Sequence, residues 1–164
     1  MFTRRRFLCL LPAFAVSAQA QTGWHVFRRK KPSAPPLPLT VYIGTDTSKG
    51  ISKGIYQAHF DATHGQLTAP ILAAATVRPS FFAITPIGLS QHFLYTVNET
   101  DDLTAAATTF AIESQTGALH QTGQVSSGGA GPAYISVDAT GHSAFIADYA
   151  GASIASYRIQ SDGT

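Results

Sequence analysis

A repeat with a period of roughly 50 residues constrains the fold of this chain more than any other feature. Residues 79–99 match residues 132–149, and the leading prolines Pro79 and Pro132 lie 53 residues apart. Each copy contains two short runs in which apolar and polar residues alternate, which is typical of half-buried strands. In the second copy these runs are joined by a turn from Asp138 to Gly141, because Asp accepts backbone hydrogen bonds and Gly adopts positive φ there.

A second hairpin follows each copy, and a partial copy precedes both. The expected strands of these parts are residues 41–45, 54–60, 66–68, 108–112, 118–122 and 154–159. Four short antiparallel strands in each repeat are typical of a β-propeller blade. We therefore predict an all-β fold, a β-propeller of four-stranded antiparallel blades, of which about two and a half are present.

Several strand ends and turns carry distinctive strings: VYIGT at 41–45, RPSF at 78–81, LYTVNE at 94–99 and GPAYISVD at 131–138. Together they resemble the lactonase family of seven-bladed β-propellers, which includes the propeller-type 6-phosphogluconolactonases and the carboxymuconate cyclases. The resemblance covers residues 39–164 and implies a ring of seven blades. We therefore expect the chain to be the N-terminal portion of a longer protein, with closure of the ring by oligomerisation as the alternative.

The first 20 residues are predicted to be an export signal. Arg4, Arg5 and Arg6 resemble a twin-arginine motif, the apolar run 7–16 is too short to span a bilayer, and residues 18–20 fit a cleavage site. We expect a periplasmic or secreted protein without stable membrane insertion after signal removal; an uncleaved anchor is the alternative. The single cysteine lies in this signal, so the mature chain needs no disulfide.

Residues 21–38 form a basic, proline-rich linker, with four consecutive cations at 28–31. This composition predicts a solvated tether, and contact with anionic lipid or nucleic acid is the alternative. The propeller segment 39–164 has four Lys and Arg but nine Asp and Glu, a net charge of −5. Such a charge argues against nucleic acid as a partner.

The topology of a four-stranded blade places the candidate site. The loop entering the first strand and the loop leaving the second emerge on the same face, because the chain has crossed the sheet twice. Residues at these ends are therefore expected to meet on one rim, which is the default ligand site. They are Thr45, Asp46, Arg78, Asn98, Glu99, Tyr134 and Asp148.

Hydrolysis of a lactone, the reaction that the resemblance implies, needs a base, hydrogen-bond donors for the oxyanion and, for a phosphorylated substrate, a cation. We expect Glu99 to be the base, Arg78 to bind the phosphate, and Tyr134 or Asn98 to donate to the oxyanion. Asp148 is expected to contact substrate. Many family members have His in place of Tyr134 and Asn in place of Asp148. The structural alternative is that Arg78 pairs with a neighbouring acid.

The expected function is hydrolysis of a sugar lactone, as in 6-phosphogluconolactonase, with a small-molecule lactone as partner. Export favours an unphosphorylated lactone. Two alternatives stay open: a non-catalytic envelope propeller that binds a protein or carbohydrate, and a muconate-type cycloisomerase. We expect no cofactor, because the chain has no nucleotide-binding or serine-hydrolase motif. We expect no metal either, because the histidines at 59, 64, 120 and 142 lie singly beside turns.

Overall fold

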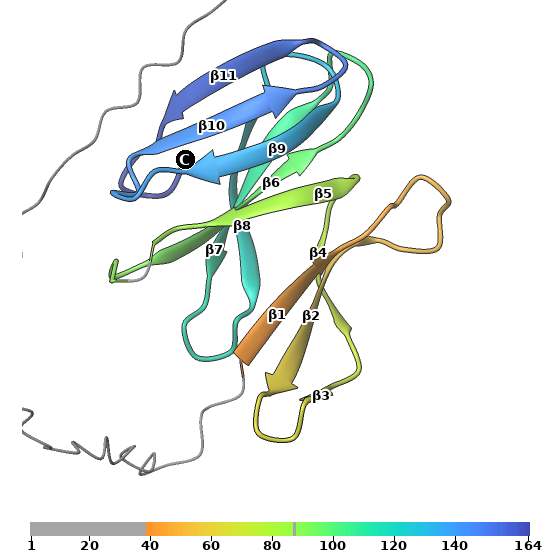
Figure 1. Ribbon diagram of the computed structural model, residues 1–164, viewed down its shortest axis with the longest axis vertical. Coiled ribbons are helices and arrows are strands. Elements are labelled where there is room, and N and C mark those ends of the chain that lie inside the picture. Colours follow the sequence, from red (N-terminus) through yellow and green to blue (C-terminus); the bar gives the residue numbers. More distant parts are fainter. Residues whose placement is uncertain (1–38, 87) are drawn as a thin grey trace, which may run out of the picture. The chain divides into compact units, whose positions relative to one another are not determined.

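The computed structural model describes residues 39–86 and 88–164, and the predictions for residues 1–38 lie outside this described part. Every regular element within it is a β-strand. The strands form three antiparallel sheets that follow one another along the sequence (Figure 1). The described part contains no helix of the length and hydrophobicity needed to cross a membrane.

The central sheet contains all four strands that the repeat predicts. They are β5 (Pro79–Ile84), β6 (His92–Asn98), β7 (Ala106–Ile112) and β8 (Leu119–Ser126). The strands pair in sequence order, each antiparallel to the one before it. The four-stranded antiparallel unit expected from the sequence is therefore confirmed.

The third sheet repeats the first three of these strands within the described residues. It comprises β9 (Pro132–Val137), β10 (Ser143–Asp148) and β11 (Ser153–Arg158), with β10 in the middle. The chain turns from β9 to β10 between Asp138 and Gly141, where Gly141 has a φ of 75°. The Asp138 carboxylate accepts the backbone N–H groups of His142 and Ser143, both at 2.8 Å. The predicted turn is thus confirmed.

The first sheet has β1 and β2 in the positions of the second and third strands of the repeat. Its strands are β1 (Leu39–Gly44), β2 (Gly54–Asp61), β3 (Gln66–Leu67) and β4 (Ile71–Ala75). Both β3 and β4 pair with β2, so they share the place of one outer strand. Pro70 lies between them and has no N–H to donate to the ladder, which explains the break. The sequence predicted β3 but missed β4.

A β-bulge at the start of β5 and of β9 shows that the two repeats match residue by residue. Pro79 pairs with Asn98 and Phe81 with Val97, so one extra residue, Ser80, lies between them. Pro132 likewise pairs with Asp148. Tyr134 then takes the place of Phe81, and the register predicted from the two prolines is confirmed.

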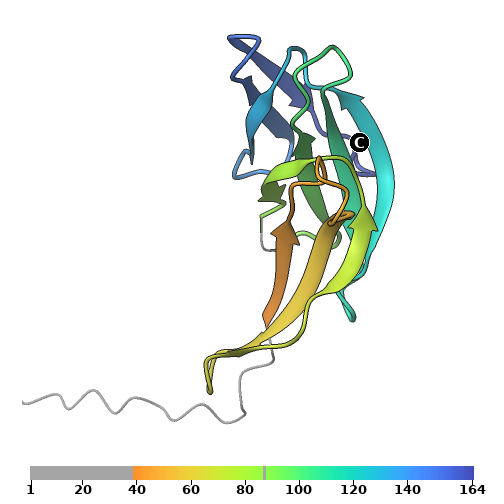
Figure 2. The same ribbon diagram turned by 90° about the vertical axis from the view of Figure 1, so that its right-hand side faces the viewer.

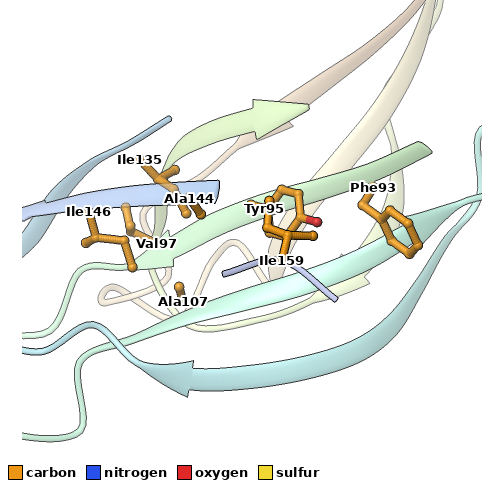
Figure 3. Close-up of a cluster of buried hydrophobic side chains, with 8 residues drawn as sticks. All are labelled: Phe93, Tyr95, Val97, Ala107, Ile135, Ala144, Ile146 and Ile159. Carbon is orange, nitrogen blue, oxygen red and sulfur yellow. The ribbon is translucent and has the colours of Figure 1, made fainter. Parts of the chain in front are cut away.

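The core lies on both faces of the central sheet. On one face alternate residues of β6, Phe93, Tyr95 and Val97, pack with Ile135 and Ile146 of the third sheet (Figure 3). On the other face Leu94 and Phe110 pack with Ile55 of the first sheet. Alternation along one buried strand therefore supplies both interfaces. The inner strands β5 and β9 are in contact, as are the outer strands β4 and β8, and Figure 2 follows the sheets from orange β1 to blue β11.

Candidate functional site

The first and central sheets enclose a small pocket at the predicted rim. Its volume is about 160 Å³. The residues that line it are Gly44, Thr45, Asp46, Arg78, Pro79, Ser80 and Glu99. They come from the end of β1, the start of β5 and the end of β6, as the blade topology predicts. We call this cavity the rim pocket.

Arg78 is held in a left-handed backbone conformation at the entrance to β5. Its φ is 39°, and the equivalent residue of the next repeat, Gly131, has a φ of 61°. A side chain in this conformation costs roughly 1–2 kcal/mol, which glycine avoids. The repeat therefore tolerates glycine at this corner, yet the central sheet carries an arginine there. Strain of this kind is a reason to suspect a function for the side chain.

Backbone hydrogen bonds hold this corner in the same way in both repeats. The Arg78 N–H donates to Thr47 Oγ1 at 3.0 Å, and the Arg78 carbonyl accepts the Glu99 N–H at 3.1 Å. The Gly131 carbonyl likewise accepts the Tyr149 N–H at 2.8 Å. These bonds fix Arg78 against the first sheet and tie it to Glu99.

Among the described residues, Arg78 has one ion pair, and it is weak. A guanidinium nitrogen lies 3.6 Å from a carboxylate oxygen of Asp101, whose side chain is 78% exposed. Such surface pairs contribute little. Hydrogen bonds from Ser48 lower the pKa of Asp46, and the positive charge of Arg78 lowers it further. Asp46 is therefore an ionised acceptor at neutral pH, and Glu99 is half-buried in the pocket wall.

Asn98 lies outside the pocket lining and has contacts of another kind. It is 3% exposed, and its amide nitrogen donates to Thr76 Oγ1 at 2.8 Å and to the Val77 carbonyl at 2.5 Å. Its amide oxygen accepts the Thr108 hydroxyl at 2.6 Å. The Thr108 hydroxyl in turn accepts Gln124 Nε2 at 3.0 Å. Both amide hydrogens of Asn98 are thus bonded to Thr76 and Val77, the two residues that precede Arg78.

Asp148 occupies the position of Asn98 in the third sheet. It is also 3% exposed, and its Oδ2 atom accepts the Ser153 hydroxyl at 3.0 Å. Among the described residues, Oδ1 has no hydrogen-bond partner. The Ala130 carbonyl, which corresponds to that of Val77, is bonded by the Gly151 N–H at 2.8 Å. The third sheet therefore needs no side-chain amide at this point.

Tyr134 is 48% exposed and lies outside the rim-pocket lining. Its ring packs on that of Phe81, with 4.7 Å between the ring centroids and an angle of 47° between the planes. The structure thus brings Arg78, Glu99 and Asp46 together in the pocket lining and leaves Tyr134, Asn98 and Asp148 outside it. The sequence interpretation missed Phe81, although the repeat aligns it with Tyr134. It also missed Thr47, for which no sequence signal exists.

A second hollow, of about 400 Å³, lies near the opposite ends of the strands, between the central and third sheets. It contains Arg158 and His142, but its lining has no Asp or Glu. We favour the rim pocket because it alone of these two combines carboxylates with a cation. No group of three or more possible metal ligands occurs within residues 39–86 and 88–164.

The successive antiparallel sheets, whose inner strands are in contact, define the chain as part of a β-propeller. The model of the lactonase family, a 7-bladed β-propeller, matches residues 40–164. The chain therefore belongs to the lactonase family of seven-bladed β-propellers, as its turns and strand ends indicated.

Solved structures support this assignment. A candidate 6-phosphogluconolactonase of Bacteroides fragilis is 34% identical, with a TM-score of 0.69, over 81% of this chain. A similar protein of Bacteroides uniformis is 34% identical over 78%, with a TM-score of 0.68. The periplasmic gluconolactonase of Pseudomonas aeruginosa is 29% identical over 78%, with a TM-score of 0.67. The chain spans 35–36% of the length of these structures. A search of curated proteins found no match.

Proposed function

We propose that the protein hydrolyses a sugar lactone at the rim pocket. The observation that carries this proposal is the strained Arg78 beside Glu99 at a corner where the equivalent residue is Gly131. Glu99 acts as the general base for a water molecule, and Arg78 stabilises the negative charge that develops on the lactone carbonyl oxygen. The same guanidinium can instead bind a carboxylate or phosphate of the substrate.

The proposed reaction is balanced by one water molecule. Glu99 takes a proton from a water molecule while the oxygen of that water forms a bond to the carbonyl carbon of the lactone. The bond between that carbon and the ring oxygen then breaks, and the proton passes to the ring oxygen, which yields an open-chain hydroxy acid. Asn98 supports this step by fixing the Val77 carbonyl, one residue before Arg78. Two residues lie outside the lining. We assign Tyr134 to substrate contact and Asp148 to support of the third sheet.

We propose an unphosphorylated sugar lactone in the periplasm or outside the cell, with 6-phosphogluconolactone as the second substrate to be tested. The export signal predicted from the sequence supports this choice, and so does the similarity to a periplasmic gluconolactonase. The rim pocket has one arginine beside two acids, which suits a neutral lactone better than a phosphate dianion.

The test is a pH-stat assay of the purified protein with glucono-δ-lactone and its 6-phosphate. Glu99→Gln should lower kcat about 100- to 10,000-fold, the usual contribution of a general base. Arg78→Gly should lower kcat/KM at least tenfold, since charge-assisted hydrogen bonds are among the stronger ones. The loss appears in kcat if the guanidinium stabilises the oxyanion, and in KM if it binds a charged group of the substrate. Glycine suits the backbone at this corner, so the variant removes the Arg78 side chain without straining the backbone.

Two matched controls lie at the other ends of the strands. Glu113→Gln and Arg158→Ala should leave the rate unchanged. Unchanged hydrolysis in Glu99→Gln would overturn the assignment of the base. If Arg158→Ala abolishes activity instead, the hollow between the central and third sheets is the active site. A protein that opens no lactone but binds a sugar or a protein would be the non-catalytic propeller.

A further inference from the structure

We propose that Phe81 and Tyr134 form an aromatic platform on which the ring of a cyclic sugar or sugar lactone stacks. This inference rests on the proposed function and names the form of the substrate that the site selects. It assigns Phe81, on β5, and Tyr134, on β9, to recognition of the ring. Arg78 and Glu99 remain assigned to the reacting end.

Both rings are partly exposed to solvent, and each lies on the first strand of its sheet. Phe81 is 39% exposed and Tyr134 is 48% exposed. Single exposed apolar side chains are common on protein surfaces, but these two touch, with ring centroids 4.7 Å apart. They occupy equivalent positions of the repeat, immediately after the bulges at Ser80 and Ala133. The repeat therefore places two aromatic faces next to each other on neighbouring sheets.

The size of the rim pocket requires a binding surface outside it. Its 160 Å³ is below the roughly 300–1,000 Å³ of pockets that enclose a whole small molecule. It has room for a carbonyl or carboxylate group, so the remainder of a sugar must lie beyond its wall. Ser80 forms part of that wall, and Phe81 is the next residue along the chain. Phe81 packs on Tyr134 of the third sheet, so the platform borders the pocket on the third-sheet side of β5.

The chemistry of the two surfaces matches the two parts of a sugar lactone. The face of an aromatic ring carries partial negative charge, which attracts the weakly positive C–H bonds on the face of a saturated ring. The Tyr134 hydroxyl adds one hydrogen-bonding group for a ring hydroxyl. The charged groups of the rim pocket are available for the ester end. An open-chain sugar acid has the charge but no fixed ring face, so the platform should discriminate against it.

The test compares a cyclic probe with an open-chain probe in binding experiments that need no turnover. The cyclic probe is D-gluconolactam, whose amide resists hydrolysis, and the open-chain probe is D-gluconate. Saturation-transfer NMR and calorimetric titration measure both affinities. The unmodified protein should bind the lactam more tightly than gluconate.

Three substitutions then locate the binding. Phe81→Leu keeps an apolar side chain but removes the aromatic face, and it should weaken lactam binding about five- to tenfold. Tyr134→Ala should weaken it by a similar factor, whereas Tyr134→Phe keeps the face and should retain most of the affinity. Far-UV circular dichroism checks that each variant is folded. Arg78→Gly serves as the contrast, since it should weaken gluconate more than the lactam.

The outcomes separate this inference from the proposed function. If the lactam binds through Phe81 and Tyr134 but no lactone is hydrolysed, the platform stands as a sugar-binding surface and the enzyme assignment fails. If lactones are hydrolysed while Phe81→Leu and Tyr134→Ala leave lactam affinity unchanged, the platform is refuted and the enzyme stands. Failure of the lactam to bind at all, or tighter binding of gluconate, also refutes the platform.

Discussion

Asn98 offers the sharpest test of how the rim is held in place. Its side chain takes part in three hydrogen bonds: to Thr76 and to the Val77 carbonyl, both partly buried, and from Thr108, which is buried. A hydrogen bond in a folded protein contributes roughly 1 kcal/mol net, and a buried partner left unpaired costs more. Asn98→Ala should therefore lower the free energy of unfolding by about 3 kcal/mol. The free energy of unfolding of a native protein is about 5–15 kcal/mol in total, so this loss is large.

Asn98→Asp keeps the shape of the side chain and reverses its chemistry. A carboxylate at this position faces the Val77 carbonyl oxygen, to which the amide nitrogen donates at 2.5 Å in the native protein. At pH 7 we expect a loss of at least 3 kcal/mol, because no hydrogen is left to donate. At low pH the protonated carboxyl can donate one hydrogen bond. The folded form then holds the proton more tightly than the unfolded form.

The sign of the pH dependence follows. The new carboxyl has a pKa above about 3.9 in the folded state, so the stability of Asn98→Asp should fall as pH rises from about 4 towards 7. Urea unfolding followed by circular dichroism at pH 4 and pH 7 measures this change. Asp148→Asn is the matched control, because Asp148 is bonded to Ser153 alone among the described residues. Its effect should stay within about 1 kcal/mol.

Two results would refute this reasoning. A loss below 1 kcal/mol in Asn98→Ala would show that the Asn98 amide does not hold the link to Arg78. Equal stability of Asn98→Asp at both pH values would show that the side chain does not face the Val77 carbonyl. In the assay of lactone hydrolysis, Asn98→Ala should lower kcat/KM, as Arg78→Gly does, since both disturb the guanidinium.

Further predictions concern the turns and the tyrosines. The Thr140 hydroxyl and backbone N–H groups lower the pKa of Asp138 to about 2, so the contribution of Asp138 to stability is lost as pH falls from about 4 to about 2. Asp138→Asn should flatten this part of the pH dependence of stability, measured by urea unfolding at each pH. Tyr42→Phe should cost about 1 kcal/mol, because its hydroxyl donates to the Gly117 carbonyl at 2.6 Å. Tyr95→Phe should cost nothing in urea titrations, because its buried hydroxyl has no partner in the described part; a cost equal to that of Tyr42→Phe would contradict this contrast.

The repeat explains how much of the fold the sequence could predict. Strands and tight turns are local features, so alternation and residues such as Asp138 and Gly141 located most of them. The match of Pro79 with Pro132 then fixed the register of two sheets. The strand β4 was missed because Pro70 interrupts the outer strand of the first sheet, and a proline normally argues against a strand.

The candidate site was harder to predict, because its geometry depends on pairing between sheets. The blade topology correctly brought the loops of Arg78, Glu99 and Asp46 to one rim. It could not show that the Asn98 amide donates its hydrogens to Thr76 and Val77. These bonds depend on where the chain leaves the outer strand of the first sheet and enters the central sheet. One available signal went unused: Gly131, aligned with Arg78, marks a corner that favours a positive φ.

The repeat also shows why the proposed chemistry belongs to one of the two junctions between sheets in the described residues. The backbone corner at Arg78 recurs at Gly131, with the same carbonyl bonded by the N–H at the end of the next strand. At the junction of the first and central sheets this corner presents a cation between Asp46 and Glu99. At the next junction the equivalent positions are Glu99, Gly131 and Tyr149, so an acid remains and the cation is lost. Because the two backbones match, the difference in chemistry between the two junctions lies in their side chains. The second junction lacks a cation because Gly131 has no side chain where the first junction has that of Arg78.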